Sequence, residues 1–151
     1  MGLRDHYIAP KPTFRETTLT RVLKEMNAKG SFSASVLATA GGLTVAVAPV
    51  DFEAQTVAAM VALVREAVDR AQIRIGMGRV DELSALDGKG MRLVCRYFDV
   101  ASEPLILAVV VPVGREYRRF TDEAIRGLLD AWYVAPVSLS GTADWSPLGT
   151  S

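Results

Sequence analysis

The residues best suited to specific chemistry lie in "GREYRRF", residues 114–120, where three arginines stand beside two aromatic residues. Guanidinium groups hold phosphates and carboxylates through paired, charge-assisted hydrogen bonds. The stretch therefore indicates a partner-binding surface carried by Arg115, Arg118 and Arg119. The alternative is a solvated loop between a strand and a helix, in which the arginines bind nothing.

Nucleophilic and metal chemistry lack their usual residues. The chain has one histidine, His6, and one cysteine, Cys95, which lies within an apolar strand pattern and is interpreted as a core residue. No group of histidine, cysteine or carboxylate side chains has the spacing of metal ligands. The acidic pairs 81–82 and 122–123 are interpreted as a solvated edge and a helix start. We expect no catalytic residue, no metal ligand and no enzymatic activity.

Two glycine-containing stretches resemble nucleotide-binding loops. "IGMG", residues 75–78, lacks the third glycine of a dinucleotide fingerprint and follows a helix instead of a strand. The pair Gly41-Gly42 separates two β-branched runs in "VLATAGGLTVAVAP", a pattern typical of a hairpin turn. No lysine follows either stretch in the manner of a phosphate-binding loop, so we expect no bound cofactor.

Composition restricts the class of protein. The chain has 151 residues, enough for one domain with a real core, and half of them are apolar. Its 17 basic and 17 acidic side chains cancel, so no overall field would attract nucleic acid or an anionic membrane. A single cysteine, no secretory signal and no apolar run of spanning length lead us to expect a cytoplasmic protein with no membrane insertion.

Periodicity predicts a helix, a hairpin, a long helix, three strands and a last helix. Because successive strands are joined by hairpin-type turns, the sheet should be mainly antiparallel, in an α/β fold of the α+β type with order α-β-β-α-β-β-β-α. The predicted domain covers 15–133, between flexible segments 1–14 and 134–151. The predicted helices are 16–29, 51–72 with Asp51 as N-cap, and 121–133 with Thr121 as N-cap; the strands are 34–39, 43–48, 79–86, 91–98 and 105–111.

The strands differ in how completely they should be buried. "LILAVVV", 105–111, is apolar at every position and should lie in the middle of the sheet, covered on both faces. "MRLVCRYF", 91–98, alternates more and should lie nearer an edge. "VDELSAL", 80–86, is the most polar strand and is predicted to form the edge itself.

The long helix has two contrasting faces when residues are placed at about 100° intervals. The broad apolar face, predicted to pack on the sheet, carries Val57, Met60, Val61, Leu63, Val64 and Val68. The opposite face is rich in alanine, either because alanine favours helices or because small residues let a second helix approach. We favour a two-fold interface that also pairs the edge strands. Its predicted residues are Gln55, Ala58, Ala59, Ala62 and Glu66 of the helix and Val80, Glu82 and Ser84 of the edge strand.

The chain resembles the Roadblock domain family, named for a dynein light chain, over about residues 15–133. The likeness is carried by the helix "TLTRVLKEMNAKG", the hairpin "SVLATAGGLTVAVA", the helix "AQTVAAMVALVREAVDRA" and the strands "MRLVCRYFD" and "LILAVVVP". The family hairpin usually has an acidic residue and a glycine in its turn. Here "TAGGLTVA" keeps the glycine and the following leucine but lacks the acid.

The resemblance implies a five-stranded antiparallel sheet with the long helix on one face and the two terminal helices on the other. It also implies a homodimer and a non-catalytic protein that binds and modulates a Ras-like small GTPase, as bacterial members do. The alternative is a signalling adaptor or scaffold with no GTPase partner. Because bacterial members are not thought to insert an arginine finger, the resemblance assigns no such role to Arg115, Arg118 or Arg119.

Overall fold

The computed structural model describes residues 14–140, which form three helices and five strands in the predicted order. The part of each predicted flexible segment that falls in 1–13 or 141–151, with His6, lies outside the described residues. The elements are α2 (Phe14–Gly30), β1 (Ala34–Thr39), β2 (Thr44–Ala48), α3 (Ala54–Ile75), β3 (Glu82–Leu86), β4 (Arg92–Val100), β5 (Glu103–Val111) and α4 (Arg118–Ser140).

The five strands form one antiparallel sheet in the order β2-β1-β5-β4-β3. The apolar strand β5 lies in the middle and pairs with β1 on one side and β4 on the other. The polar strand β3 lies at one edge. Both positions confirm what the hydrophobic pattern predicts, because a strand buried on both faces must be apolar at successive positions.

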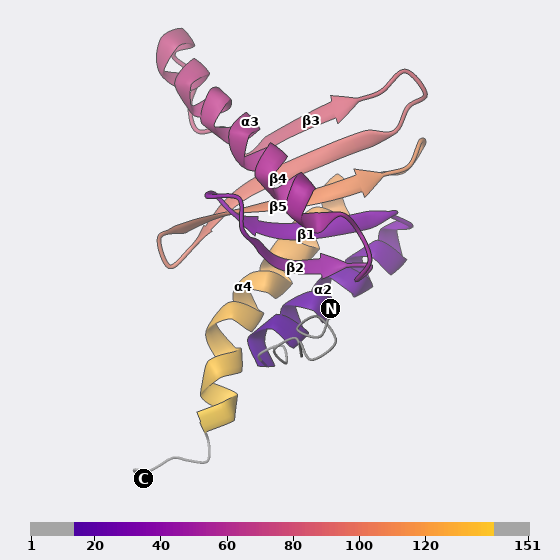
Figure 1. Cartoon of the computed structure of the whole chain (residues 1–151), viewed down its shortest axis with the longest axis vertical. Coiled ribbons are helices and arrows are strands. Elements are labelled where there is room, and N and C mark those ends of the chain that lie inside the picture. Colours follow the sequence, from indigo (N-terminus) through magenta and orange to yellow (C-terminus); the bar gives the residue numbers. More distant parts are fainter. Residues whose placement is uncertain (1–13, 141–151) are drawn as a thin grey trace, which may run out of the picture.

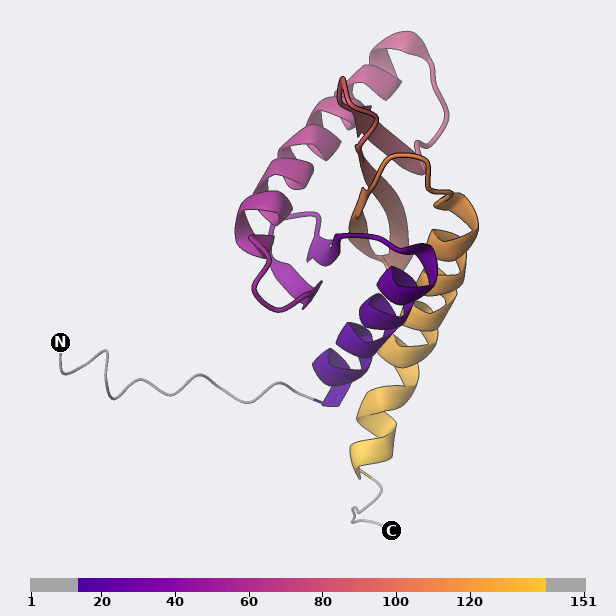
Figure 2. The ribbon, with the colours of Figure 1, turned by 90° about the vertical axis from the view of Figure 1, so that its right-hand side faces the viewer.

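The sheet separates two helical layers (Figures 1 and 2), with α3 on one face and α2 and α4 side by side on the other. Alternate residues of β5 supply the two cores. Leu105, Leu107 and Val109 join the cluster beneath α2 and α4, whereas Ile106 and Ala108 join the cluster beneath α3. The predicted arrangement of one long helix opposite the two terminal helices is confirmed.

The face of α3 that meets the sheet differs from the predicted one. Its buried residues are Ala54, Ala58 and Val61, spaced four and three apart along one narrow stripe. Ala54 and Ala58 pack against Val36 and Ala38 of β1. Because the contact residues on both sides are small, the helix lies close to the strands. The prediction that Ala58 points away from the sheet was therefore wrong.

The large apolar residues of α3 are correspondingly displaced toward solvent. Met60, Leu63 and Val64 are predicted to face the sheet, yet they are 55%, 68% and 40% exposed. The prediction was wrong because a helical wheel ranks faces by bulk apolarity, whereas a close helix–sheet contact favours small side chains. Val57 and Val68, predicted on the same face, are partly buried.

Two helix starts also differ from the prediction. Glu53, without a side-chain cap hydrogen bond, precedes α3, so Asp51 is not its N-cap. Helix α4 begins at Arg118 and extends to Ser140, beyond the predicted end at Tyr133. Thr121 lies within the first turn of α4, where its hydroxyl donates to the carbonyl of Arg118 at 3.0 Å.

The glycine turn brings the β1–β2 hairpin against α3. Gly42 has a φ of +95°, a left-handed conformation that favours glycine, and its N–H donates to the carbonyl of Thr39 at 3.0 Å. A Cβ at this position would lie 3.4 Å from the Cα of Ala59 and 3.6 Å from the Cβ of Ala62. The glycine therefore both turns the chain and lets the hairpin approach the helix.

Candidate functional site

Within residues 14–140 the structure contains no group of side chains arranged to hold a metal ion, and no helix that could cross a bilayer. Cys95 is buried beneath α3, and burial raises the pKa of its thiol to about 11. A thiol with so high a pKa carries almost no nucleophilic thiolate at neutral pH. Its interpretation as a core residue agrees with this environment. Two surfaces of the described residues are candidates for binding other molecules.

The first candidate is the outward face of α3, which we call the α3 surface: Ala59, Met60, Leu63, Val64 and Ile73. Ile73, near the C-terminal end of the helix, is 85% exposed. In Figure 1 this end of α3 projects past the strands. So many large apolar side chains on one side of a helix are typical of a protein–protein interaction surface.

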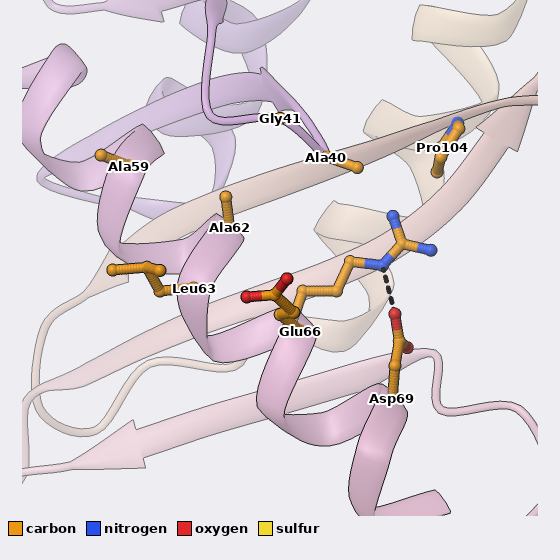
Figure 3. A pocket seen from close by; sticks show the side chains of 9 residues that line it. Ala40, Gly41, Ala59, Ala62, Leu63, Glu66, Asp69 and Pro104 are labelled. Atoms are coloured by element: carbon orange, nitrogen blue, oxygen red, sulfur yellow. Dashed lines mark ion pairs between the residues drawn. The ribbon is translucent and has the colours of Figure 1, made fainter. Parts of the chain in front are cut away.

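A hollow of about 640 Å³ lies where α3 meets the β1–β2 turn and the start of β5 (Figure 3). Ala59, Ala62 and Leu63 line it from the helix, while Ala40 and Gly41 line it from the turn. Four of these five residues are alanine or glycine, so little side-chain volume fills this part of the hollow. The hollow therefore extends the α3 surface toward the hairpin.

One end of this hollow is charged. The Nε atom of Arg65 lies 3.7 Å from Oδ2 of Asp69, one turn along α3, and Glu66 stands beside them (Figure 3). The guanidinium also lies 5.8 Å from the ring centroid of Tyr97, a buried β4 residue. Burial is the main reason that the pKa of Tyr97 is raised to about 12. The hollow thus combines an apolar wall with a charged end.

The remaining predicted interface residues lie near this surface or at the sheet edge. Gln55, Ala59, Glu66 and Ser84 are exposed, whereas Ala62, Val80 and Glu82 are half-buried. Among the described strands, β3 pairs with β4 alone, so its outer edge has no strand partner. An unpaired edge is a template for strand addition by another chain. The predicted interface itself stays a prediction, now without Ala58.

The second candidate, which we call the arginine depression, is a hollow of about 740 Å³ at the start of α4. It brings together the three arginines that the sequence singles out. The structure adds two that the sequence analysis missed, Arg92 at the start of β4 and Arg126 in α4. The lining residues are Arg92, Arg115, Glu116, Tyr117, Arg118, Arg119, Asp122 and Arg126.

Arg118 is held in place by acidic residues of its own chain. It pairs with Glu82 of β3, and its Nη2 lies 3.2 Å from Oδ2 of Asp81. Tyr117 donates a hydrogen bond of 2.5 Å to Glu82. The hydrogen bond to Glu82 is the largest cause of the raised pKa of Arg118 and of the raised pKa of Tyr117. The interpretation of residues 81–82 as a solvated edge was wrong for Glu82, which is half-buried and faces α4, whereas Asp81 is exposed.

The other arginines of the depression are less constrained. Nη2 of Arg119 lies 3.9 Å from Oε1 of Glu116, and both side chains are largely exposed. Within residues 14–140, no carboxylate lies at ion-pair distance from Arg92, Arg115 or Arg126. A spacing signal for Arg126 exists in the sequence, since it lies seven residues after Arg119 and hence on the same helical face.

The fold defined by these layers is that of the Roadblock/LC7 domain. No protein-family model matches the chain, and no curated protein sequence matches it. Several solved structures, however, are similar to it. The gliding protein MglB of Thermus thermophilus is 21% identical, with a TM-score of 0.63 over 82% of this chain and 97% of that one.

Two further solved structures have similar sequence identities, TM-scores and coverage. A structure described as MglB with tetrameric arrangement is 19% identical, with a TM-score of 0.65, covering 85% of this chain and 99% of that one. A Roadblock/LC7 domain from Streptomyces avermitilis is 18% identical, with a TM-score of 0.63, covering 80% of this chain and 97% of that one. These likenesses confirm, at the level of the fold, the Roadblock resemblance that the sequence carries.

Proposed function

We propose that this chain is a non-catalytic regulatory or scaffold protein that forms a homodimer and binds a Ras-like small GTPase. The observation that carries the proposal is the apolar α3 surface beside an unpaired edge strand, on a Roadblock fold. Both features expose groups that a second chain would cover. The described residues offer no metal cluster and only a buried cysteine, which supports a binding role over a catalytic one.

Self-association is the first part of the proposal. A two-fold axis beside α3 would place two copies of the α3 surface against each other, with the small residues Ala59 and Ala62 allowing close approach. The tetrameric arrangement of one structurally similar protein supports an assembly of several copies. The GTPase partner is the second part, and its support is the fold shared with MglB together with the sequence resemblance.

Replacing Val64 with arginine is expected to weaken the dimer at least about tenfold, because a charged side chain would be buried in the interface. The measurement is sedimentation velocity over a range of protein concentrations. Val113→Arg is the matched control, since Val113 is 66% exposed in the β5–α4 loop, outside the α3 surface. A wild-type chain that sediments as a monomer, or a Val64→Arg variant that dimerises like the control, would contradict the proposed interface.

The GTPase partner is tested by nucleotide-dependent pull-down. Immobilised protein is incubated with each small GTPase of its source organism, loaded with GDP or with a non-hydrolysable GTP analogue. We expect one GTPase to be retained in preference for one nucleotide state, because a regulator must distinguish the states that it couples. If the dimer forms but no GTPase is retained in either state, the scaffold alternative replaces this part of the proposal.

A further inference from the structure

The arginine depression lies on the opposite side of the sheet from the α3 surface. On strand β4, Arg92 lies on the same face as Val94 and Arg96, because alternate residues of a strand share a face. Val94 packs in the cluster beneath α2 and α4, and Arg96 pairs with Asp122 of α4. Helix α3 covers the other face (Figure 2). A dimer formed through α3 would leave one open depression on each copy. The depression therefore faces away from the α3 part of the proposed dimer interface.

The depression carries an excess of positive charge on a chain whose charges balance overall. Five arginines and two carboxylates line it. Both carboxylates are already engaged: Asp122 lies 2.8 Å from Nη2 of the buried Arg96, and Glu116 stands near Arg119. Arg92, Arg115 and Arg126 have no such partner among residues 14–140. Their guanidinium groups are available to carboxylates supplied by another molecule.

The distribution of the arginines indicates what kind of anion fits. Arg119 and Arg126 are seven residues apart, which places their Cα atoms about 10 Å apart along α4. Arg92 enters from β4 and Arg115 from the loop before the helix. An extended peptide places alternate side chains about 7 Å apart on one side. Several carboxylates on one chain would match separated guanidinium groups better than a single phosphate group does.

We infer that the arginine depression docks an acidic segment of a partner protein. Arg92, Arg115 and Arg126 bind its carboxylates, while Arg118 is fixed by Asp81 and Glu82 and shapes the wall. The inferred set differs from the three arginines that the sequence singles out, because Arg118 pairs with acidic residues of its own chain. The inference is independent of the proposed GTPase partner and of dimer formation.

The test is a fluorescence anisotropy titration of the full chain against a fluorescein-labelled peptide of six glutamates. We expect saturable binding that weakens as salt is added. The triple variant Arg92→Gln, Arg115→Gln, Arg126→Gln should bind at least about tenfold more weakly, because three charge-assisted contacts are lost. The matched control, Arg21→Gln, Lys24→Gln, Arg70→Gln, changes the net charge equally at exposed sites and should stay within about twofold of wild type.

Several results would overturn the inference: no binding by the wild type, equal weakening in both triple variants, or displacement of the peptide by pyrophosphate at equal concentration, which would indicate a small-anion site. Circular dichroism checks that each variant folds. If the triple variant does not fold, the single loop variant Arg115→Gln decides the matter, with an expected weakening of about threefold against none for Arg21→Gln. The assay contains no GTPase, so its failure is distinct from a failure of the pull-down.

Discussion

Replacing Leu107 with alanine is expected to lower the free energy of unfolding by about 3 kcal/mol. Leu107 is fully buried in β5, the middle strand, beneath α2 and α4. Strand pairing on both sides, with Leu37 of β1 and Arg96 of β4, prevents β5 from moving into the space that the leucine leaves. The change therefore combines lost apolar burial with a cavity that stays open. Urea denaturation at a fixed protein concentration measures it.

Leu43→Ala is the control for this prediction, since it removes the same atoms from a side chain that is 71% exposed beside the hairpin turn. The free energy of unfolding should change by no more than about 0.5 kcal/mol, as is usual for surface substitutions. Equal shifts of the denaturation midpoint in both variants would contradict a core centred on β5. A changed slope in either variant would indicate an altered unfolded or native state, or unfolding that is not two-state.

The central position of β5 could be predicted because the pattern that indicates it lies entirely within the strand's own sequence. Every position of 105–111 is apolar, and a strand with two apolar faces must have a layer on each side. The faces of α3 could not be assigned in the same way. Ala58 and Val61 meet the sheet while Leu63 points outward, since the small residues of β1 and α3 fit closely. The stripe of α3 that packs on the sheet depends on the shapes of both the helix and the sheet, and the helix sequence describes only the helix.

Only the part of the arginine depression that is contiguous in the sequence could be predicted. Arg115, Arg118 and Arg119 are neighbours in the sequence, so a local pattern reveals them. The carboxylate of Glu82 that holds Arg118 is 36 residues away and reaches it only because β3 pairs with β4 beside α4. Arg92 enters the same hollow through that pairing. Charge partners brought together by strand register are invisible to a pattern search along the chain.

Replacing Arg96 with alanine is expected to cost about 2 to 3 kcal/mol of the free energy of unfolding. Its side chain is only 7% exposed. Nη1 donates to the Thr121 hydroxyl at 2.6 Å, and Nη2 lies 2.8 Å from Oδ1 of Asp122. The Thr121 hydroxyl then donates to the carbonyl of Arg118 at 3.0 Å. One buried guanidinium therefore joins β4 to the first turn of α4, which also forms a wall of the arginine depression.

The loss of stability in Arg96→Ala comes partly from the lost charge and hydrogen bonds and partly from the lost side-chain volume, and a second variant separates the two. Alanine removes both the charge and the volume of Arg96 and leaves Thr121 without its donor, whereas Arg96→Met restores much of the volume and should recover about half of the loss. The estimate lies below that for a fully buried ion pair because Asp122 is 41% exposed and regains water. Arg21→Ala, an exposed change within α2, should alter stability by no more than about 0.5 kcal/mol in the same urea titration. If Arg96→Ala is no more costly than Arg21→Ala, the buried guanidinium does not anchor α4 to the sheet.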